Sequence, residues 1–261
     1  MTLRRRNRGT GPAAAQAAGY SFGERTDAPR LPVANEDGAQ RLERYFREHN
    51  EGPGLWKWLH YFEIYERHLG RFGGRAEVHV LEIGIYSGGS IGMWRDYFGD
   101  SLRFYGVDIE PDCNVYQEEH VDIFIGDQAD PAFWRETLPQ IPRLDVVIDD
   151  GGHVPYQQIA TLEATLPVLA PGGVYLCEDI HDTANDFHEY IAGLSRNLNS
   201  KGSGTDGYTR EPIGFQRLVH SIHLYPFVTV IERREHQLEM LHAPKMGTRW
   251  QPFYDPDWRK P

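Results

Sequence analysis

The sequence predicts an α/β protein built on a doubly wound, mostly parallel sheet. Three apolar runs indicate this fold class, because each has the pattern of a buried strand that ends in a polar turn. They are residues 78–83, before a glycine-rich turn, residues 144–148, before Asp149-Asp150, and residues 173–177, before Glu178-Asp179. In a parallel sheet these ends lie along one edge, where open α/β sheets bind ligands.

Further strands and helices alternate with these runs, as a doubly wound sheet requires. The other predicted strands are 103–107, 121–125 and 227–232. The predicted helices are 39–49, 55–72, 89–98, 112–119, 131–138 and 155–168. In the helix 55–72, aromatic and apolar residues recur at three-to-four spacing and are expected in the core: Trp58, Phe62, Tyr65 and Leu69. From their position, we hypothesise that His60 and Tyr61 reach over a cofactor.

Composition shifts suggest four segments. Residues 1–32 are polar, aperiodic and rich in Gly, Pro and Ala, so we expect a poorly ordered tail. Residues 33–74 are expected to form a helical lid or N-terminal extension, residues 75–235 the sheet domain, and residues 236–261 a C-terminal tail.

The net charge of −11 argues against a nucleic-acid partner, because no net positive field would attract phosphates. The basic stretch of Arg4, Arg5, Arg6 and Arg8 is interpreted as part of the tail. No apolar run is long enough to span a bilayer, so no membrane role is predicted. Two cysteines, of which Cys177 belongs to a predicted buried strand, and the lack of a signal-peptide pattern predict a cytoplasmic protein.

Polar turns follow the first three strands in order. Glu82 and Gly84 belong to the first, Asp108 follows the second, and Asp127 and Gln128 follow the third. Taken singly, each could be a strand-end turn or a helix cap. Taken together they indicate a nucleoside site, because an acid after the second strand can accept hydrogen bonds from both ribose hydroxyls.

These turns resemble the successive cofactor motifs of class I S-adenosylmethionine-dependent methyltransferases. The motifs are Glu82-Ile83-Gly84, Gly106-Val107-Asp108 and Gly126-Asp127. The resemblance implies a Rossmann-like fold with an N-terminal helical lid and S-adenosyl-L-methionine as cofactor. It assigns cofactor binding to Glu82, Gly84, Tyr86, Ser87, Asp108, Asp127, Gln128 and Asp149. For Asp149, the alternative of capping its turn and orienting its neighbours stays open.

The second half, from about residue 144, is similar to the metal-dependent sugar O-methyltransferases of macrolide and related antibiotic pathways. The resemblance covers roughly residues 55–233 and rests on Asp149-Asp150-Gly151-Gly152-His153 and Glu178-Asp179. It implies Mg²⁺ bound by Asp150, Glu178 and Asp179, with His153 as the base. The short, arginine-rich N-terminus departs from the family's pattern, in which larger relatives carry an extra domain. This departure leaves two questions open: whether the protein forms a homo-oligomer, and how it recognises its acceptor.

The chemistry agrees with this resemblance, because a hydroxyl needs activation before it accepts a methyl group. Mg²⁺ held by oxygen ligands lowers the pKa of a hydroxyl, and a neutral histidine can take its proton. The predicted acceptor is a sugar hydroxyl on a glycosylated natural product or on its nucleotide-sugar precursor. The alternatives are a catechol- or phenol-directed O-methyltransferase, a metal-dependent hydrolase or hydroxylase, and a catalytically silent binding module.

Overall fold

The structure is a computed structural model that describes residues 11–27, 41–204, 209–244 and 246–247. The chain divides into two compact units, Met1–Ala39 and Gln40–Pro261. Of the predicted tails and lid, residues 1–10, 28–40, 245 and 248–261 lie outside the described residues, and so does the basic stretch near the N-terminus.

The first unit contains the helix α1 (Pro12–Glu24), where the sequence analysis predicted poor order. That prediction gave too little weight to five alanines, the residue with the highest helix propensity, and to Pro12 in the first turn, where its fixed φ suits a helix. No residue of α1 is buried, so the helix rests on local propensity.

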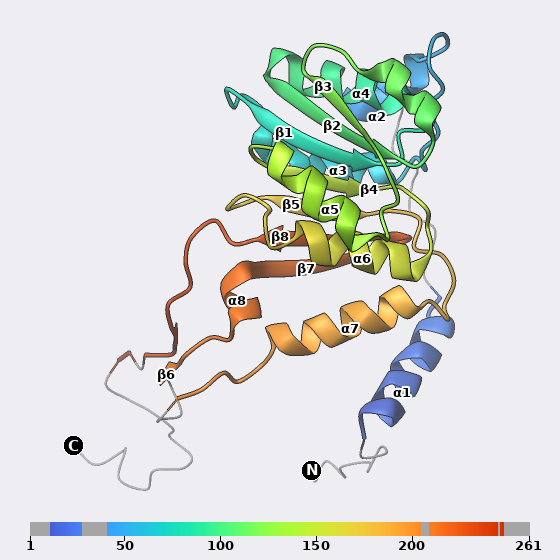
Figure 1. Ribbon diagram of the computed structural model, residues 1–261. Helices are drawn as coiled ribbons and strands as arrows, with labels where there is room; N and C mark the ends of the chain where they lie inside the picture. Colours follow the sequence, from blue (N-terminus) through green and yellow to red (C-terminus); the bar gives the residue numbers. More distant parts are fainter. Residues whose placement is uncertain (1–10, 28–40, 205–208, 245, 248–261) are drawn as a thin grey trace, which may run out of the picture. The chain divides into compact units, whose positions relative to one another are not determined.

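A seven-stranded sheet forms the centre of the second unit, with the order β3-β2-β1-β4-β5-β8-β7 (Figure 1). The strands are β1 (Val78–Ile83), β2 (Leu102–Asp108), β3 (Val121–Ile125), β4 (Val146–Asp149), β5 (Val174–Cys177), β7 (Val219–Tyr225) and β8 (Val228–Arg233). The first five are parallel, which confirms the predicted doubly wound, mostly parallel sheet. A separate pair is made by β6 (Thr209–Arg210) and β9 (Leu241–His242).

The strand predicted at 227–232 corresponds to β8, whereas its antiparallel direction and the strand β7 were not predicted. β8 runs antiparallel to β5, and β7 runs antiparallel to β8. The strand β7 carries polar residues at alternating and adjacent positions and lies at the edge, so it has no continuous apolar run to reveal it.

The register of the parallel strands brings the predicted turns to one edge. Ile83 pairs with Val107 on one side and with Asp149 on the other, and Asp149 pairs with Cys177. The residues that follow these partners therefore emerge side by side at the carboxyl ends of the strands, as predicted for a ligand site.

Helices cover both faces of the sheet. They are α2 (Arg41–Glu48), α3 (Tyr61–Leu69), α4 (Gly89–Phe98), α5 (Pro131–Thr137), α6 (Pro155–Thr165), α7 (Asp186–Leu198) and the short α8 (Gly214–Leu218). One apolar cluster joins α2, α3 and α4 to the sheet, and a second joins α5, α6 and α7. Cys177 is fully buried in the second cluster, which confirms its predicted place in the core.

Two predicted helices differ in the structure. The segment 112–119 is replaced by a 3₁₀ helix, Pro111–Tyr116. The helix 55–72 begins only at Tyr61, because residues 54–58 adopt a non-helical path along the ligand edge. Phe62 and Tyr65 are buried as predicted, whereas Trp58 is 49% exposed and is not a core residue.

Polar contacts fix the helix α3 to the antiparallel strands β7 and β8. The Nδ1 atom of His68 lies 2.9 Å from Oε1 of Glu232 on β8, and its Nε2 atom lies 2.9 Å from the hydroxyl of Tyr225 on β7. These contacts fix the C-terminal end of α3 near the start of β5, with which Glu232 pairs.

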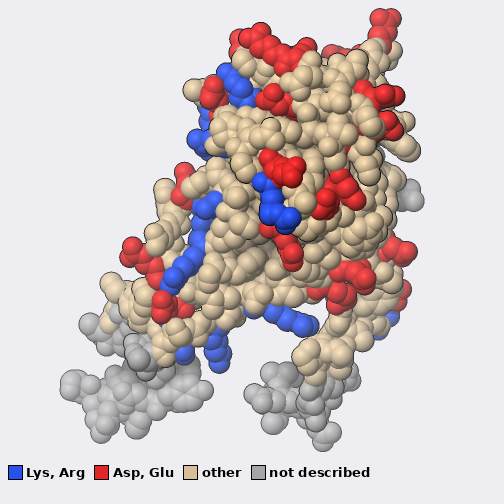
Figure 2. Space-filling view, viewed as in Figure 1, with Lys and Arg blue, Asp and Glu red and all other residues tan. Residues whose placement is uncertain are grey.

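Figure 2 shows one face of the molecule, on which acidic side chains are scattered and basic ones form smaller patches between them. This distribution agrees with the net charge of −11. Within the described residues, no helix combines the length and the apolar character needed to cross a membrane.

Candidate active site

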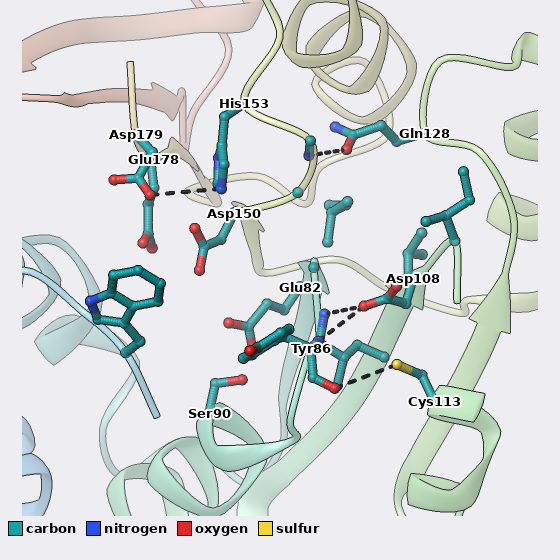
Figure 3. A pocket seen from close by; sticks show the side chains of 18 of the residues that line it. Glu82, Tyr86, Ser90, Asp108, Cys113, Gln128, Asp150, His153, Glu178 and Asp179 are labelled. Carbon is teal, nitrogen blue, oxygen red and sulfur yellow. Dashed lines mark hydrogen bonds and ion pairs between the residues drawn. The ribbon is translucent and has the colours of Figure 1, made fainter. Parts of the chain in front are cut away.

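A cavity of about 900 Å³ opens at the carboxyl edge of the parallel strands, within the size range of small-molecule sites. All but one of the predicted site residues line it: Glu82, Gly84, Tyr86, Ser87, Asp108, Asp127, Gln128, Asp150, His153, Glu178 and Asp179. Figure 3 shows Asp150, His153, Glu178 and Asp179 toward one side and Asp108 with Cys113 toward the other. The exception is Asp149, which lies behind the wall.

The glycine-rich turn after β1 is shaped by close backbone contacts. Gly84 has φ +87°, and a Cβ at this position would lie 2.1 Å from the carbonyl oxygen of Asp150. Only glycine combines this conformation with such an approach. The turn of the predicted cofactor site is thus in direct contact with the turn of the predicted metal site.

Asp108 organises the same turn from the neighbouring strand. Its Oδ2 accepts hydrogen bonds from the backbone N–H groups of Ile85 and Tyr86, at 2.9 and 3.0 Å. Its Oδ1 accepts one from the N–H of Glu110, at 2.9 Å. The two hydrogen bonds to Oδ2 use both of its lone pairs, whereas Oδ1 keeps one. The exposed Glu110 also lines the cavity, so the sequence analysis missed a second carboxylate at this end.

Gln128 and Asp149 form a buried pair beneath the cavity. The amide nitrogen of Gln128 donates to Oδ1 of Asp149 at 3.0 Å, and the hydroxyl of Tyr175 donates to its Oδ2 at 3.2 Å. Burial raises the pKa of Asp149 to about 7, against the opposing effect of these hydrogen bonds. The placement agrees with the supporting role left open for Asp149, and the oxygen of Gln128 accepts from the N–H of Gly152 at 2.8 Å.

At the other end, three side chains bring potential metal ligands together. Atoms of Asp150, His153 and Asp179 lie within 4.8 Å of one another. The Nε2 atom of His153 is 3.7 Å from Oδ2 of Asp179, and that of His181 is 3.5 Å from Oδ1. Carboxylate oxygens are the ligands that Mg²⁺ prefers, so this end fits a divalent cation.

Three of the six non-glycine residues with positive φ in the described part of the chain line the same cavity. Tyr86, His153 and Asp179 have φ values of +49°, +52° and +52°, in the left-handed region that non-glycine residues seldom occupy. All three line the cavity. Such conformations cost about 1–3 kcal/mol each and persist where the surroundings impose them, typically at functional sites.

A residue that the sequence analysis missed lies among the acids. The ammonium group of Lys57 is 2.5 Å from Oδ2 of Asp150, 2.9 Å from Oε2 of Glu178 and 3.7 Å from Oε1 of Glu82. Burial disfavours the charged ammonium, but the neighbouring Asp150 and Glu178 hold the pKa of Lys57 well above its ordinary value. The only sequence signal was a charged residue inside a run of large apolar ones.

Glu178 lies deeper than the other predicted metal ligands and both its oxygens are engaged. Oε1 accepts a hydrogen bond from the hydroxyl of Tyr65 at 2.5 Å, and Oε2 accepts one from Lys57. Burial raises the pKa of Glu178 to about 8, while the Lys57 ammonium acts in the opposite direction. Glu82 is also fully buried, and burial raises its pKa as well.

Comparisons with known proteins agree with this site. Residues 81–180 match the family model described as a methyltransferase domain. The chain is 32% identical over 203 residues to the 8-demethyl-8-α-L-rhamnosyl tetracenomycin-C 2′-O-methyltransferase of Streptomyces olivaceus, covering 70% of this chain and 52% of the relative. It is 38% identical over 133 residues to the demethylmacrocin O-methyltransferase of Streptomyces fradiae, covering 48% and 33%. The chain thus spans about half or less of the length of these relatives.

A solved structure shares the fold. The MycE methyltransferase of the mycinamycin biosynthetic pathway, determined in complex with Mg, SAH and mycinamycin VI, superposes with a TM-score of 0.61 at 23% identity. The match covers 76% of this chain and 54% of that one. Residues 81–180 are thus identified as a methyltransferase domain built on a doubly wound sheet, and the chain is similar in sequence to the two O-methyltransferases named above.

Proposed function

We propose that this protein transfers a methyl group from S-adenosyl-L-methionine to a sugar hydroxyl, with the help of Mg²⁺. The acceptor is a glycosylated natural product or its nucleotide-sugar precursor. The observation that carries the proposal is one cavity that joins turns suited to a nucleoside with a cluster of carboxylates and a histidine. The names of the sequence relatives, and the Mg and SAH in the MycE complex, support it.

The cofactor would lie along the turns after β1, β2 and β3. Glu82, Gly84, Tyr86 and Ser87 belong to the first turn, and the close approach at Gly84 leaves backbone facing the cavity. Oδ1 of Asp108 has one lone pair left, which would accept a hydrogen bond from a ribose hydroxyl. Asp127 and Gln128, which line the same cavity, would contact the base, and Asp149 would support Gln128 through its hydrogen bond. S-Adenosyl-L-methionine supplies the methyl group when bound.

Asp150, Glu178 and Asp179 would hold the metal. When bound there, Mg²⁺ lowers the pKa of an acceptor hydroxyl and orients it. Asp150 and Asp179 face the cavity beside His153, while Glu178 lies beneath them. The acids at this edge outnumber the single ammonium of Lys57, so the residues present carry the negative charge that a divalent ion requires.

His153 would act as the general base. Its ring lies at the turn after β4, with Nε2 3.7 Å from a carboxylate oxygen of Asp179 that helps to orient it. An imidazole is a poorer ligand for Mg²⁺ than an oxygen, which favours proton transfer over ligation for this side chain. Taking the proton from the acceptor hydroxyl leaves the oxygen as the nucleophile.

The mouth of the cavity offers a surface for the acceptor. Trp56 and Tyr86 line it and are 88% and 77% exposed. Large apolar side chains left exposed at a concave site are typical of ligand-binding surfaces. They suit an acceptor larger than a free sugar.

The direct test is transfer of labelled methyl groups from S-adenosyl-L-methionine to a panel of glycosylated natural products, nucleotide sugars and catechols, with and without Mg²⁺. The proposal expects labelled sugar products that require Mg²⁺. Labelling of catechols alone would replace the sugar acceptor by a phenolic one. Cofactor binding without transfer to any of the three classes would favour a binding role.

A further inference from the structure

The segment before and within α3 supplies hydrogen-bond donors to the proposed metal ligands. Lys57 donates to Asp150 at 2.5 Å and to Glu178 at 2.9 Å. The other three donors are the indole of Trp58 and the hydroxyl of Tyr61, at 3.0 and 2.6 Å from Oδ1 of Asp179, and the hydroxyl of Tyr65, at 2.5 Å from Oε1 of Glu178. One short stretch of chain thus contacts all three acids.

Lys57 differs from the other donors because it is a cation among the acids. Its side chain is 3% exposed, and those of its partners Glu82 and Glu178 are 0% and 1% exposed. Such a buried ammonium is stable only where carboxylates compensate the loss of hydration. Three carboxyl groups surround this one ammonium, and Oε1 of Glu82 has no hydrogen-bond partner among the described residues.

A divalent ion held by Asp150 and Glu178 would meet the same carboxylates that Lys57 contacts. Two cations a few ångströms apart repel each other, and they also compete for the lone pairs of the acids. The presence of Lys57 therefore lowers the affinity for the ion relative to the same acids alone.

We propose that Lys57 is a positioning residue that shares Asp150 and Glu178 with the divalent ion and keeps the ion's affinity low. The inference rests on the metal site proposed above and adds that a cation of the protein itself lowers the affinity of that site for the ion. Lys57 also anchors residues 54–58 on the acids, so the path of this segment along the cavity is tied to the charge of the metal site. In this arrangement metal binding and the position of the segment are coupled.

The test is Mn²⁺ binding, followed by the loss of the free-ion paramagnetic resonance signal, for the wild type and for Lys57→Met. We expect the variant to bind Mn²⁺ about tenfold or more tightly, because a repelling charge is removed while all the acids remain. A merely structural role for Lys57 predicts the opposite, since loosened acids bind the ion more weakly. Unchanged or weaker binding would therefore overturn the inference.

Three further variants make the result interpretable. Lys57→Arg keeps the charge and is expected to retain affinity close to that of the wild type, even if Lys57→Met folds poorly. In Lys57→Met combined with Glu178→Gln, one acid is removed with the cation, and the affinity should return toward the wild-type value. Lys201→Met removes a positive charge from an exposed loop and should leave Mn²⁺ binding unchanged.

Thermal unfolding supplies a second readout without turnover. Because a ligand that binds the folded state stabilises it, Mn²⁺ should raise the melting temperature of Lys57→Met more than that of the wild type. An equal rise in both proteins contradicts the proposed competition. If neither the wild type nor Lys57→Met binds Mn²⁺ by either method, the metal assignment itself fails and this inference fails with it.

Discussion

Gly84 and Asp150 are in backbone contact, although they follow different strands of the sheet. A Cβ on Gly84 would lie 2.1 Å from the carbonyl oxygen of Asp150 and 2.7 Å from its carbonyl carbon. Glu82, two residues before Gly84, and Asp150 both form ion pairs with Lys57. The cofactor turn and the metal turn therefore form one packed unit, and a change in one should be felt in the other.

Gly84→Ala should destabilise the protein by about 2 kcal/mol or more, because it adds both a strained φ and a clash with backbone. Gly74→Ala is the matched control, since Gly74 has φ +78° but no atom within 4 Å of a Cβ. Urea unfolding of both variants isolates the cost of the close approach. Equal losses of stability would mean that the contact with Asp150 adds nothing.

Asp108→Asn should weaken the binding of S-adenosylhomocysteine by about 10- to 150-fold, the usual cost of losing a hydrogen bond to a charged acceptor. Titration calorimetry measures the affinity. Glu110→Gln is the informative comparison, because Glu110 also lines this end of the cavity. If only Glu110→Gln loses affinity, the ribose acceptor is Glu110 and Asp108 serves the turn alone.

Chelation should abolish methyl transfer, and added Mg²⁺ should restore it. Asp150→Asn keeps the shape of the side chain but removes its charge, so we expect weaker metal binding and a higher Mg²⁺ requirement in a folded protein. Asp100→Asn, at an exposed position that does not line the cavity, is the control. Full activity in EDTA would remove the metal from the mechanism.

His153→Ala should slow single-turnover methyl transfer by about 10²- to 10⁴-fold, the usual effect of removing a general base. The wild-type rate should fall on acidification, since a protonated imidazole cannot accept a proton. Cofactor affinity should stay nearly constant. His181→Ala tests the rival, because His181 also lies beside Asp179. A slow His181→Ala with a normal His153→Ala would assign the base to His181.

Glu232, which lies outside the cavity, should make the stability of the protein depend on pH. The hydrogen bond from His68 lowers the pKa of Glu232 from 4.5 to about 2, with Arg71 contributing in the same direction. A lowered folded-state pKa stabilises the fold above the unfolded-state value, and this contribution is lost as the pH falls from about 4.5 to about 2.

Glu232→Gln should therefore be less stable than the wild type near neutral pH, and the difference should shrink in acid. Urea unfolding across pH 7 to pH 3 measures this. Glu48→Gln, at an exposed position on α2, should show no such trend. A Glu232→Gln deficit that is constant with pH would exclude a charge effect.

The apolar pattern of the chain was enough to predict the parallel strands and the edge at which they end. The predicted strands 78–83 and 121–125 coincide with β1 and β3, and the predicted helix 89–98 coincides with α4. Buried parallel strands are continuous apolar runs, and the polar residues that follow them must emerge at one edge. Local pattern was thus enough to bring the acids and His153 into one cavity, as the structure shows.

The positions of Lys57 and Asp149 depend on long-range contacts that no local pattern reveals. Lys57 meets Asp150 and Glu178 across 93 and 121 residues of sequence, and Asp149 faces Gln128 rather than the cavity. The antiparallel strand β7 and the late start of α3 at Tyr61 were also decided by packing. Periodicity reports which face of an element is buried, but not its partners. Long-range contacts set those partners, because a buried charge is stable only where an opposite charge or a hydrogen bond compensates its lost hydration.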